Sequence, residues 1–177
     1  RKAKEWFASY TAYYDMEDPT IALKAVHTYH VAELCQTIAE SLALNEVECM
    51  AAWLSGLLHD VGRFEQIRRF NTFSDADSID HALLSTEILF GTKEDASCGR
   101  IRQVILDPSW DIYLYKAIKY HSAYRLPPDL SEMEKTYCQI LRDADKIDIF
   151  RVNLETPMED IYNTTTETLK QAEVTSE

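Results

Sequence analysis

The chain has 177 residues, of which 46% are hydrophobic, and a formal net charge of -12 at neutral pH. Such an acidic surface repels phosphate backbones and anionic membranes, which excludes a general nucleic-acid binder and a membrane-adhering protein. Glycine and proline number only four and five, which favours helices over strands and turns. We therefore predict an all-α fold in a single domain over 1–177, with a frayed tail at about 170–177.

The four cysteines, Cys35, Cys49, Cys98 and Cys138, are scattered without a CxxC pair. At least the first two lie in apolar helical patterns, so we expect reduced, buried thiols and a cytoplasmic protein. No charged-then-apolar leader is present, and no apolar run approaches the ~18 residues of a membrane span, so we expect neither secretion nor membrane insertion. The aromatic first helix leaves open a homo-oligomer, because it could pack on its own core or on a second copy.

Apolar periodicity and helix-end signals predict about seven to nine helices. In chain order, the predicted segments are 2–14, 20–44, 45–59, 78–90, 96–106, 111–121, 131–149 and a short one over 158–169. Capping boxes open two of them, at Asn45 with Glu48 and at Ser131 with Glu134.

The helix that ends at His59 carries small residues, including Ala52 and Gly56, one or two turns before its end, which would let neighbouring helices come close. Gly62 is expected to end this helix in the left-handed conformation. The irregular segment 66–77 is expected to form a loop over the site.

Six polar residues fall on the apolar faces or at the ends of predicted helices. They are His27, His59, Asp60, His81, His121 and Asp145. A lone histidine on an apolar face is more often a hydrogen-bonded core residue, so the prediction depends on the whole set. Because buried polar groups without partners are unfavourable, we expect the six to share one or two divalent transition-metal ions, with Fe, Mn, Ni, Co and Zn not distinguishable from the ligands.

The other acidic residues nearby are given no metal role. Asp143 and Asp148, on the helix of Asp145, are expected to face solvent or to cap charges. The spacing of Asp75, Asp77 and Asp80 lacks the glycine and the closing glutamate of a calcium loop.

The order of His27, the motif HDVGRF at 59–64 and the motif RDADKID around Asp145 resembles the HD superfamily of metal-dependent phosphohydrolases, over about 24–150. The resemblance implies a compact helical bundle in which His27, His59, Asp60 and Asp145 ligate one ion. His81 and His121 look like the histidines that hold a second ion in the binuclear branch, with Asp60 bridging. Cyclic-dinucleotide phosphodiesterase activity is not assigned, because the chain lacks their GYP signature.

Arg63 stands where relatives often carry lysine, and its guanidinium could hold phosphate oxygens bidentately. Lys146, next to Asp145, is a second candidate, although a solvated helix lysine is an equally good interpretation, and Lys24 is a third. We therefore expect a hydrolase that cleaves phosphoester or phosphoanhydride bonds of a small, nucleotide-like phosphorylated substrate by metal-activated water, with Asp60, Arg63 and Lys146 at the reacting centre. The alternatives are an HD-type di-iron oxygenase and a non-catalytic nucleotide-binding sensor.

Overall fold

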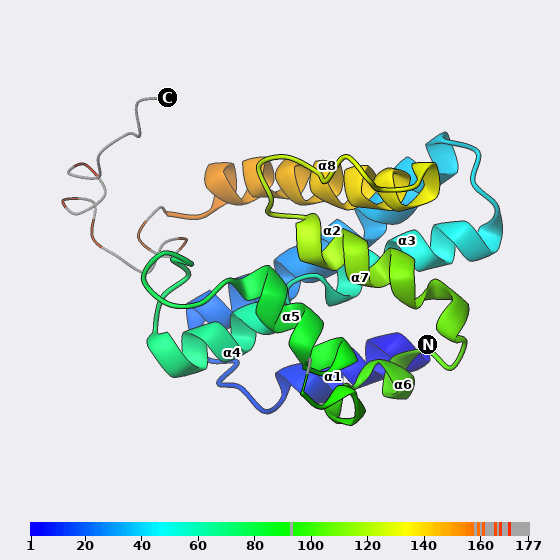
Figure 1. The fold of residues 1–177 in the computed structure, drawn as a ribbon. Helices are drawn as coiled ribbons and strands as arrows, with labels where there is room; N and C mark the ends of the chain where they lie inside the picture. Colours follow the sequence, from blue (N-terminus) through cyan, green and yellow to red (C-terminus); the bar gives the residue numbers. More distant parts are fainter. Residues whose placement is uncertain are drawn as a thin grey trace.

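The computed structural model describes residues 1–92, 94–157, 159, 161, 165, 167 and 170. Within them the chain forms eight α-helices and two 3-10 turns, and no strand (Figure 1). The elements are α1 (Lys2–Thr11), α2 (Pro19–Ser41), α3 (Glu46–Leu58), α4 (Val61–Phe70), α5 (His81–Phe90), η1 (Ala96–Cys98), α6 (Ile101–Val104), η2 (Pro108–Trp110), α7 (Asp111–Tyr120) and α8 (Glu132–Glu155). The prediction of an all-α fold is confirmed.

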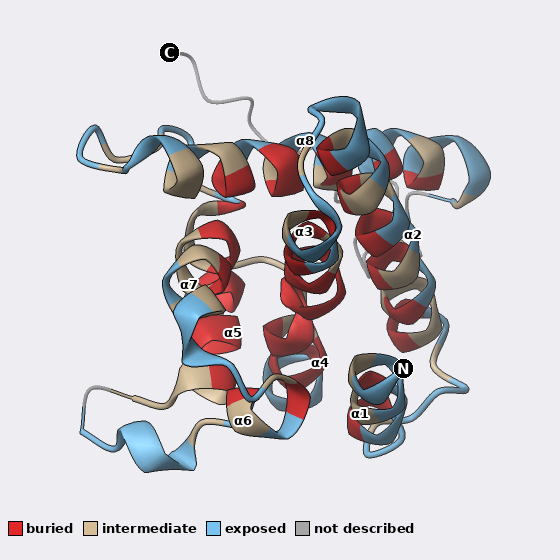
Figure 2. Cartoon of the chain, turned by 90° about the vertical axis from the view of Figure 1, so that its right-hand side faces the viewer, coloured by how far each residue is buried: buried red, intermediate tan, exposed pale blue. Residues whose placement is uncertain are grey.

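Helix α3 lies at the centre of the bundle. Figure 2 shows it between α2 on one side and α5 and α7 on the other, with α8 crossing one end. Leu54, Leu57 and Leu58 are buried, as are the small residues between them, so α3 is covered on most of its circumference. A helix that packs on all sides carries its last residues into the interior, and His59 directly follows α3.

The two predicted capping boxes are present. The side chain of Asn45 accepts from the backbone of α3, and the carboxylate of Glu48 accepts from the backbone N–H of Asn45. Ser131 and Glu134 make the same reciprocal pair at the start of α8. Both boxes satisfy backbone N–H groups that a helix start leaves without partners.

Two glycines allow helices to approach closely. A Cβ at Gly56 would lie 2.7 Å from Cα of Ala32, so α2 and α3 could not pack at this distance with a larger residue. A Cβ at Gly62 would lie 2.4 Å from the carbonyl oxygen of His81. The expectation that Gly62 ends a helix is wrong, because it lies in the first turn of α4, and α4 instead ends at Asn71 in the left-handed conformation.

Other boundaries also differ from those predicted. Helix α4 continues to Phe70, so the irregular segment is shorter than 66–77, and Gln66 is buried within a helix. The predicted helix over 96–106 is reduced to η1 and the single turn of α6. The predicted segment 158–169 lies largely outside the described residues.

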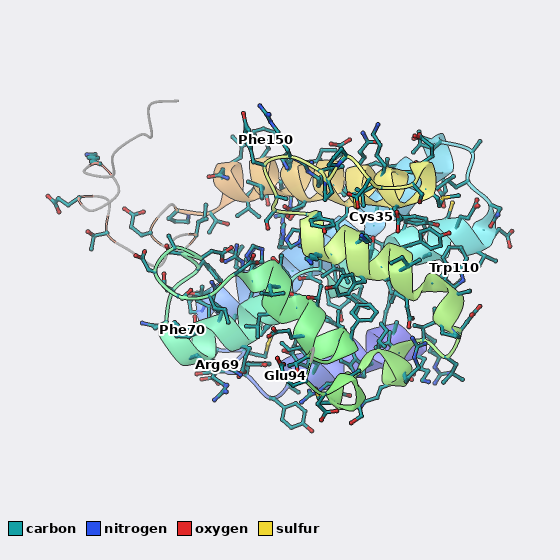
Figure 3. All side chains as sticks on the ribbon, in the orientation of Figure 1. Cys35, Arg69, Phe70, Glu94, Trp110 and Phe150 are labelled. Atoms are coloured by element: carbon teal, nitrogen blue, oxygen red, sulfur yellow. The ribbon has the colours of Figure 1, made fainter. Side chains whose placement is uncertain are left out.

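The aromatic face of α1 packs on the core of its own chain. Phe7 is fully buried, and its ring lies 5.9 Å from the ring of Phe64 on α4. Cys35, Cys49 and Cys138 are buried free thiols, whereas Cys98 is exposed. Phe150 projects from the outer side of α8 (Figure 3), where its side chain is exposed. In the described part of the chain, no helix has the length and apolar character needed to cross a membrane.

Candidate metal centre

The structure brings together the six predicted residues, which lie in or next to six helices. His27 and Asp145 lie within α2 and α8, whereas the other four lie at helix ends: His59 ends α3, Asp60 precedes α4, His81 opens α5 and His121 ends α7. All except Asp145 are at least 97% buried, and Asp145 is partly exposed. Residues separated by more than 100 positions in the chain therefore meet in one cluster.

One half of the cluster surrounds Oδ2 of Asp60. Nε2 of His27 lies 3.1 Å from Oδ1 of Asp145 and 3.9 Å from Oδ2 of Asp60. Nε2 of His59 lies 3.7 Å from the same Asp145 oxygen and 3.4 Å from the same Asp60 oxygen. We call this half, formed by His27, His59, Asp145 and Oδ2 of Asp60, the first position.

The other half surrounds Oδ1 of Asp60. This oxygen lies 3.6 Å from Nε2 of His81 and 3.6 Å from Nε2 of His121, and the two nitrogens lie 3.0 Å apart. We call this half the second position. The two oxygens of Asp60 therefore face different sets of histidines, which is the arrangement that a bridging carboxylate requires.

Each of the four imidazoles uses Nδ1 for a hydrogen bond that points away from the centre. His59 and His121 donate to the carbonyl oxygens of Gly56 and Ile118, in both cases at 2.7 Å. These carbonyls belong to the last turns of α3 and α7, where a helix leaves acceptors without partners. A carbonyl only accepts, so Nδ1 of each ring carries a proton and Nε2 faces the centre.

His27 and His81 are held by carboxylates instead. Nδ1 of His27 lies 2.7 Å from Oδ2 of Asp148, and Nδ1 of His81 lies 2.6 Å from Oδ2 of Asp75. An ionised carboxylate accepts from Nδ1–H, which again directs the Nε2 lone pair to the centre. Carboxylate or carbonyl partners of this kind fix the tautomer of metal-binding histidines in proteins.

These polar atoms fit a metal ion better than a plain hydrogen-bonded core. Nε2 of His27, Nε2 of His59 and Oδ1 of Asp60 are buried without a hydrogen-bond partner. The facing Nε2 lone pairs of His81 and His121 cannot bond to each other when both protons lie on Nδ1. Ligand atoms about 2.0–2.2 Å from a shared ion lie about 2.8–3.6 Å apart, close to the separations of 3.0–3.9 Å in the two positions.

Asp60 sits at the start of α4 but does not cap it. Six other residues that precede described helices or 3-10 turns, including Asp18 and Asp80, accept from backbone N–H groups of the following turn. The carboxylate of Asp60 makes no such bond. It thereby forgoes about 1 kcal/mol of helix capping and remains available to the cluster.

The electrostatics of the cluster favour a bound cation. Burial opposes ionisation of Asp60, but Lys24 and His59 outweigh it and hold the pKa of this carboxyl well below its usual range. The pKa of Asp145 is likewise lowered despite burial, by the neighbouring imidazoles of His27 and His59. Burial lowers the pKa of His59, but Asp60 and Asp145 outweigh it and raise it to about 10. Burial lowers the pKa of His81 to about 4, so this ring is neutral.

Two cations border the centre. Nζ of Lys24 lies 3.0 Å from Oδ2 of Asp60. Nε of Arg63 lies 3.9 Å from Oδ1 of Asp60 and is buried without a hydrogen-bond partner, whereas Nη1 of Arg63 donates to the 71–80 segment. Lys146 is exposed and lines a separate groove of about 720 Å³ with residues such as Leu42 and Leu126. The structure therefore brings Arg63 to the cluster but not Lys146.

Asp148 is a site residue that the sequence interpretation missed. It was expected to face solvent or cap charges, but it is 2% exposed. Besides its contact with His27, it accepts hydrogen bonds from Nε and Nη2 of Arg151 at 2.7 and 3.0 Å. Its other oxygen lies 3.2 Å from Nδ1 of His30. The signal for it was its position three residues after Asp145, which places both carboxylates on one side of α8.

The family assignment agrees with this geometry. The model of the HD domain family matches residues 25–149, which include all six clustered residues. The chain belongs to the HD domain family. Membership of this family indicates the superfamily of metal-dependent hydrolases, and the buried His/Asp cluster is compatible with an HD-type metal site. Comparisons with curated proteins and with solved structures gave no match.

Proposed function

We propose that this HD-domain protein is a phosphohydrolase that cleaves a phosphoester or phosphoanhydride bond of a small, nucleotide-like substrate. The observation that carries the proposal is the convergence of four Nε2 atoms around the two oxygens of a single carboxylate, Asp60. His27, His59 and Asp145 would hold one ion with Asp60, and His81 and His121 would hold a second. When bound, such ions lower the pKa of water toward neutrality and neutralise phosphoryl oxygens.

Asp60 is proposed to orient the attacking water and not to act as its base. A carboxyl whose pKa lies well below the usual range is a poor proton acceptor near neutral pH. Its two oxygens are directed to the two positions, so it is also the residue that sets their separation.

Lys24 and Arg63 are proposed to bind the phosphate. The Lys24 ammonium is close to Asp60 and partly exposed, and Nε of Arg63 has no partner of its own. Two cations beside ionised carboxylates suit an anionic substrate, which favours phosphoryl chemistry over a neutral substrate. Lys146 was predicted to join them, but its placement in another groove gives this role no support.

The decisive experiment is elemental analysis of the purified protein, followed by a panel of phosphoesters and nucleotides under each metal found. We expect one to two ions per chain and metal-dependent release of phosphate from at least one class of phosphorylated substrate. A protein that binds metal but hydrolyses none of the panel would contradict the proposal.

Two further measurements on the same protein, oxygen consumption and nucleotide binding, separate the alternatives. Four imidazoles and two carboxylates also suit two iron ions, so oxygen consumption by iron-loaded protein would instead support an HD-type oxygenase. Tight nucleotide binding without turnover would support a sensor. Either result replaces the hydrolase proposal and leaves the metal centre itself in place.

A further inference from the structure

The segment between α4 and α5, residues 71–80, carries the partner of one metal-facing histidine. Asp75 uses both oxygens: Oδ2 lies 2.6 Å from Nδ1 of His81, and Oδ1 accepts from Nη1 of Arg63 at 2.8 Å and from Nε2 of Gln66 at 2.9 Å. Asp75 is therefore bound on one side by a residue of the second position and on the other by α4.

Arg63 and Gln66 attach the 71–80 segment to α4 at further points. Nη1 of Arg63 donates to the carbonyl oxygen of Phe73 at 2.6 Å and to Oε1 of Gln66 at 2.7 Å. Nε2 of Gln66, a fully buried residue, also lies 2.9 Å from Oγ of Ser78 and 3.0 Å from the carbonyl oxygen of Ile79. Buried amide and guanidinium groups with this many acceptors restrict the segment to one arrangement.

An aromatic contact holds the same segment against the cluster. The ring of Phe73 lies below Nζ of Lys24 at 5.3 Å and below Cζ of Arg63 at 5.6 Å. Such cation–π contacts are attractive, and they strengthen where they are shielded from water. The segment is thus bound to α2, α4 and α5 at once, and Asp75 is its link to His81.

We propose that Asp75, held by Arg63 and Gln66, is a positioning residue that orients His81 and so controls metal binding at the second position alone. The proposal rests on the metal centre of the proposed function. Asp75 contacts no residue of the first position, where the equivalent carboxylate on His27 is Asp148 of α8. Loss of Asp75 therefore frees the His81 ring, whereas His27 and His59 keep their Nδ1 partners.

The test measures binding of Mn²⁺ alone to the full chain, by calorimetry and by metal content after gel filtration. Asp75→Ala is expected to weaken the second Mn²⁺ by about 10- to 100-fold and to leave the first unchanged. Asp75→Asn is expected to restore part of the affinity, because an amide oxygen still accepts from Nδ1–H. Asp77→Ala, in the same segment but exposed, is the matched control and should bind both ions normally.

A spectroscopic readout separates positioning from general stabilisation. In ¹⁵N NMR of the metal-free protein, the wild-type and Asp75→Asn rings of His81 should show the Nδ1–H tautomer, and Asp75→Ala should show a mixture. Equal weakening of both ions in a folded Asp75→Ala variant, or wild-type affinity for both, overturns the proposal, as does a wild-type protein that saturates at one Mn²⁺. Wild-type protein that binds two ions but hydrolyses nothing overturns only the hydrolase function.

Discussion

The two halves of the centre are built alike but supported differently. Each has one histidine held by a carbonyl of its own helix, His59 or His121, and one held by a carboxylate. At the first position that carboxylate is Asp148, 2% exposed within the 24-residue helix α8. At the second it is Asp75, whose side chain is 36% exposed in an irregular segment.

The first position also has a further carboxylate, Asp145, and the second position has no counterpart among the contacts of His81 and His121. More negative charge and a more rigid support both raise metal affinity. The comparison predicts an asymmetric centre, with a stronger first position and a second position that depends on the 71–80 segment.

The largest effect is expected from the residue that both halves share. Asp60→Ala should lower metal affinity at both positions by more than about a hundredfold, because it removes a ligand and not only an outer partner. Metal content and phosphatase activity should fall together. Asp60→Asn, which keeps the shape of the side chain, is the control for a folding defect. A folded Asp60→Ala protein that keeps its metal and activity would show that the centre is misplaced.

The next prediction is the counterpart of Asp75→Ala. Asp148→Ala should weaken the first Mn²⁺ by about 10- to 100-fold through the loss of orientation of His27. It should also lower the free energy of unfolding by about 1–3 kcal/mol, because Arg151 loses two hydrogen bonds. Asp143→Ala, exposed on the same helix, is the control. If Asp148→Ala weakens the second ion instead, the assignment of supports to positions is wrong.

Substitution of the two closely packed glycines tests which helices support which of the two metal positions. Gly62→Ala would push α4 from the carbonyl of His81, and Gly56→Ala would push α3 from Ala32 on the helix of His27. Each is expected to lower the free energy of unfolding by about 1–3 kcal/mol in thermal or urea melts. Gly62→Ala should affect mainly the second ion and Gly56→Ala mainly the first. The reverse pattern in calorimetry would break the comparison.

The smallest effect concerns α4 away from both positions. Arg68 and Arg69 bind Glu65 and, against the opposing effect of its partial burial, lower its pKa from the usual 4.5 to about 2. Because the folded pKa is depressed, Glu65 stabilises the protein above pH 4.5, and this contribution disappears as the pH falls through about 2.

Glu65→Gln should therefore lower the free energy of unfolding by about 1 kcal/mol at pH 7, a modest figure because both arginines are half-exposed to solvent. The difference from wild type, followed in urea melts from pH 7 to 2, should vanish at the acid end. Mn²⁺ binding should not change. A changed affinity for the second Mn²⁺ would mean that any perturbation of α4 reaches that position. Such a result would weaken the evidence for a specific role of Asp75.

Several structural predictions from the sequence were confirmed because they depend on local chemistry. The capping boxes at Asn45 and Ser131 need only residues three apart, and both are present. The all-α fold followed from helical periodicity and few glycines and prolines, signals that act along one segment at a time. The convergence of the six site residues was predicted from their place on apolar faces and helix ends.

The wrong predictions concern residues whose role depends on a neighbour that is distant in the sequence. Gly62 was expected to end a helix, but its lack of a side chain instead lets the carbonyl oxygen of His81, 19 residues away, lie close to α4. Asp148 was expected to face solvent or cap charges, but its partner His27 lies 121 residues before it. Asp75 was dismissed as part of an incomplete calcium loop, and its contact with Arg63 arises only when the segment folds back on α4.

By itself the sequence determined which imidazoles and carboxylates lie on core-facing positions and at helix ends, because residue type and helical periodicity decide both. The tertiary structure alone decided how those groups are oriented. The tautomer of each imidazole depends on an acceptor that helix packing brings to Nδ1, and the division of the centre into two unequal halves depends on where α8 and the 71–80 segment lie. Asp60 illustrates both: the sequence predicts it as a ligand, whereas only the packing directs one of its oxygens to His27 and His59 and the other to His81 and His121.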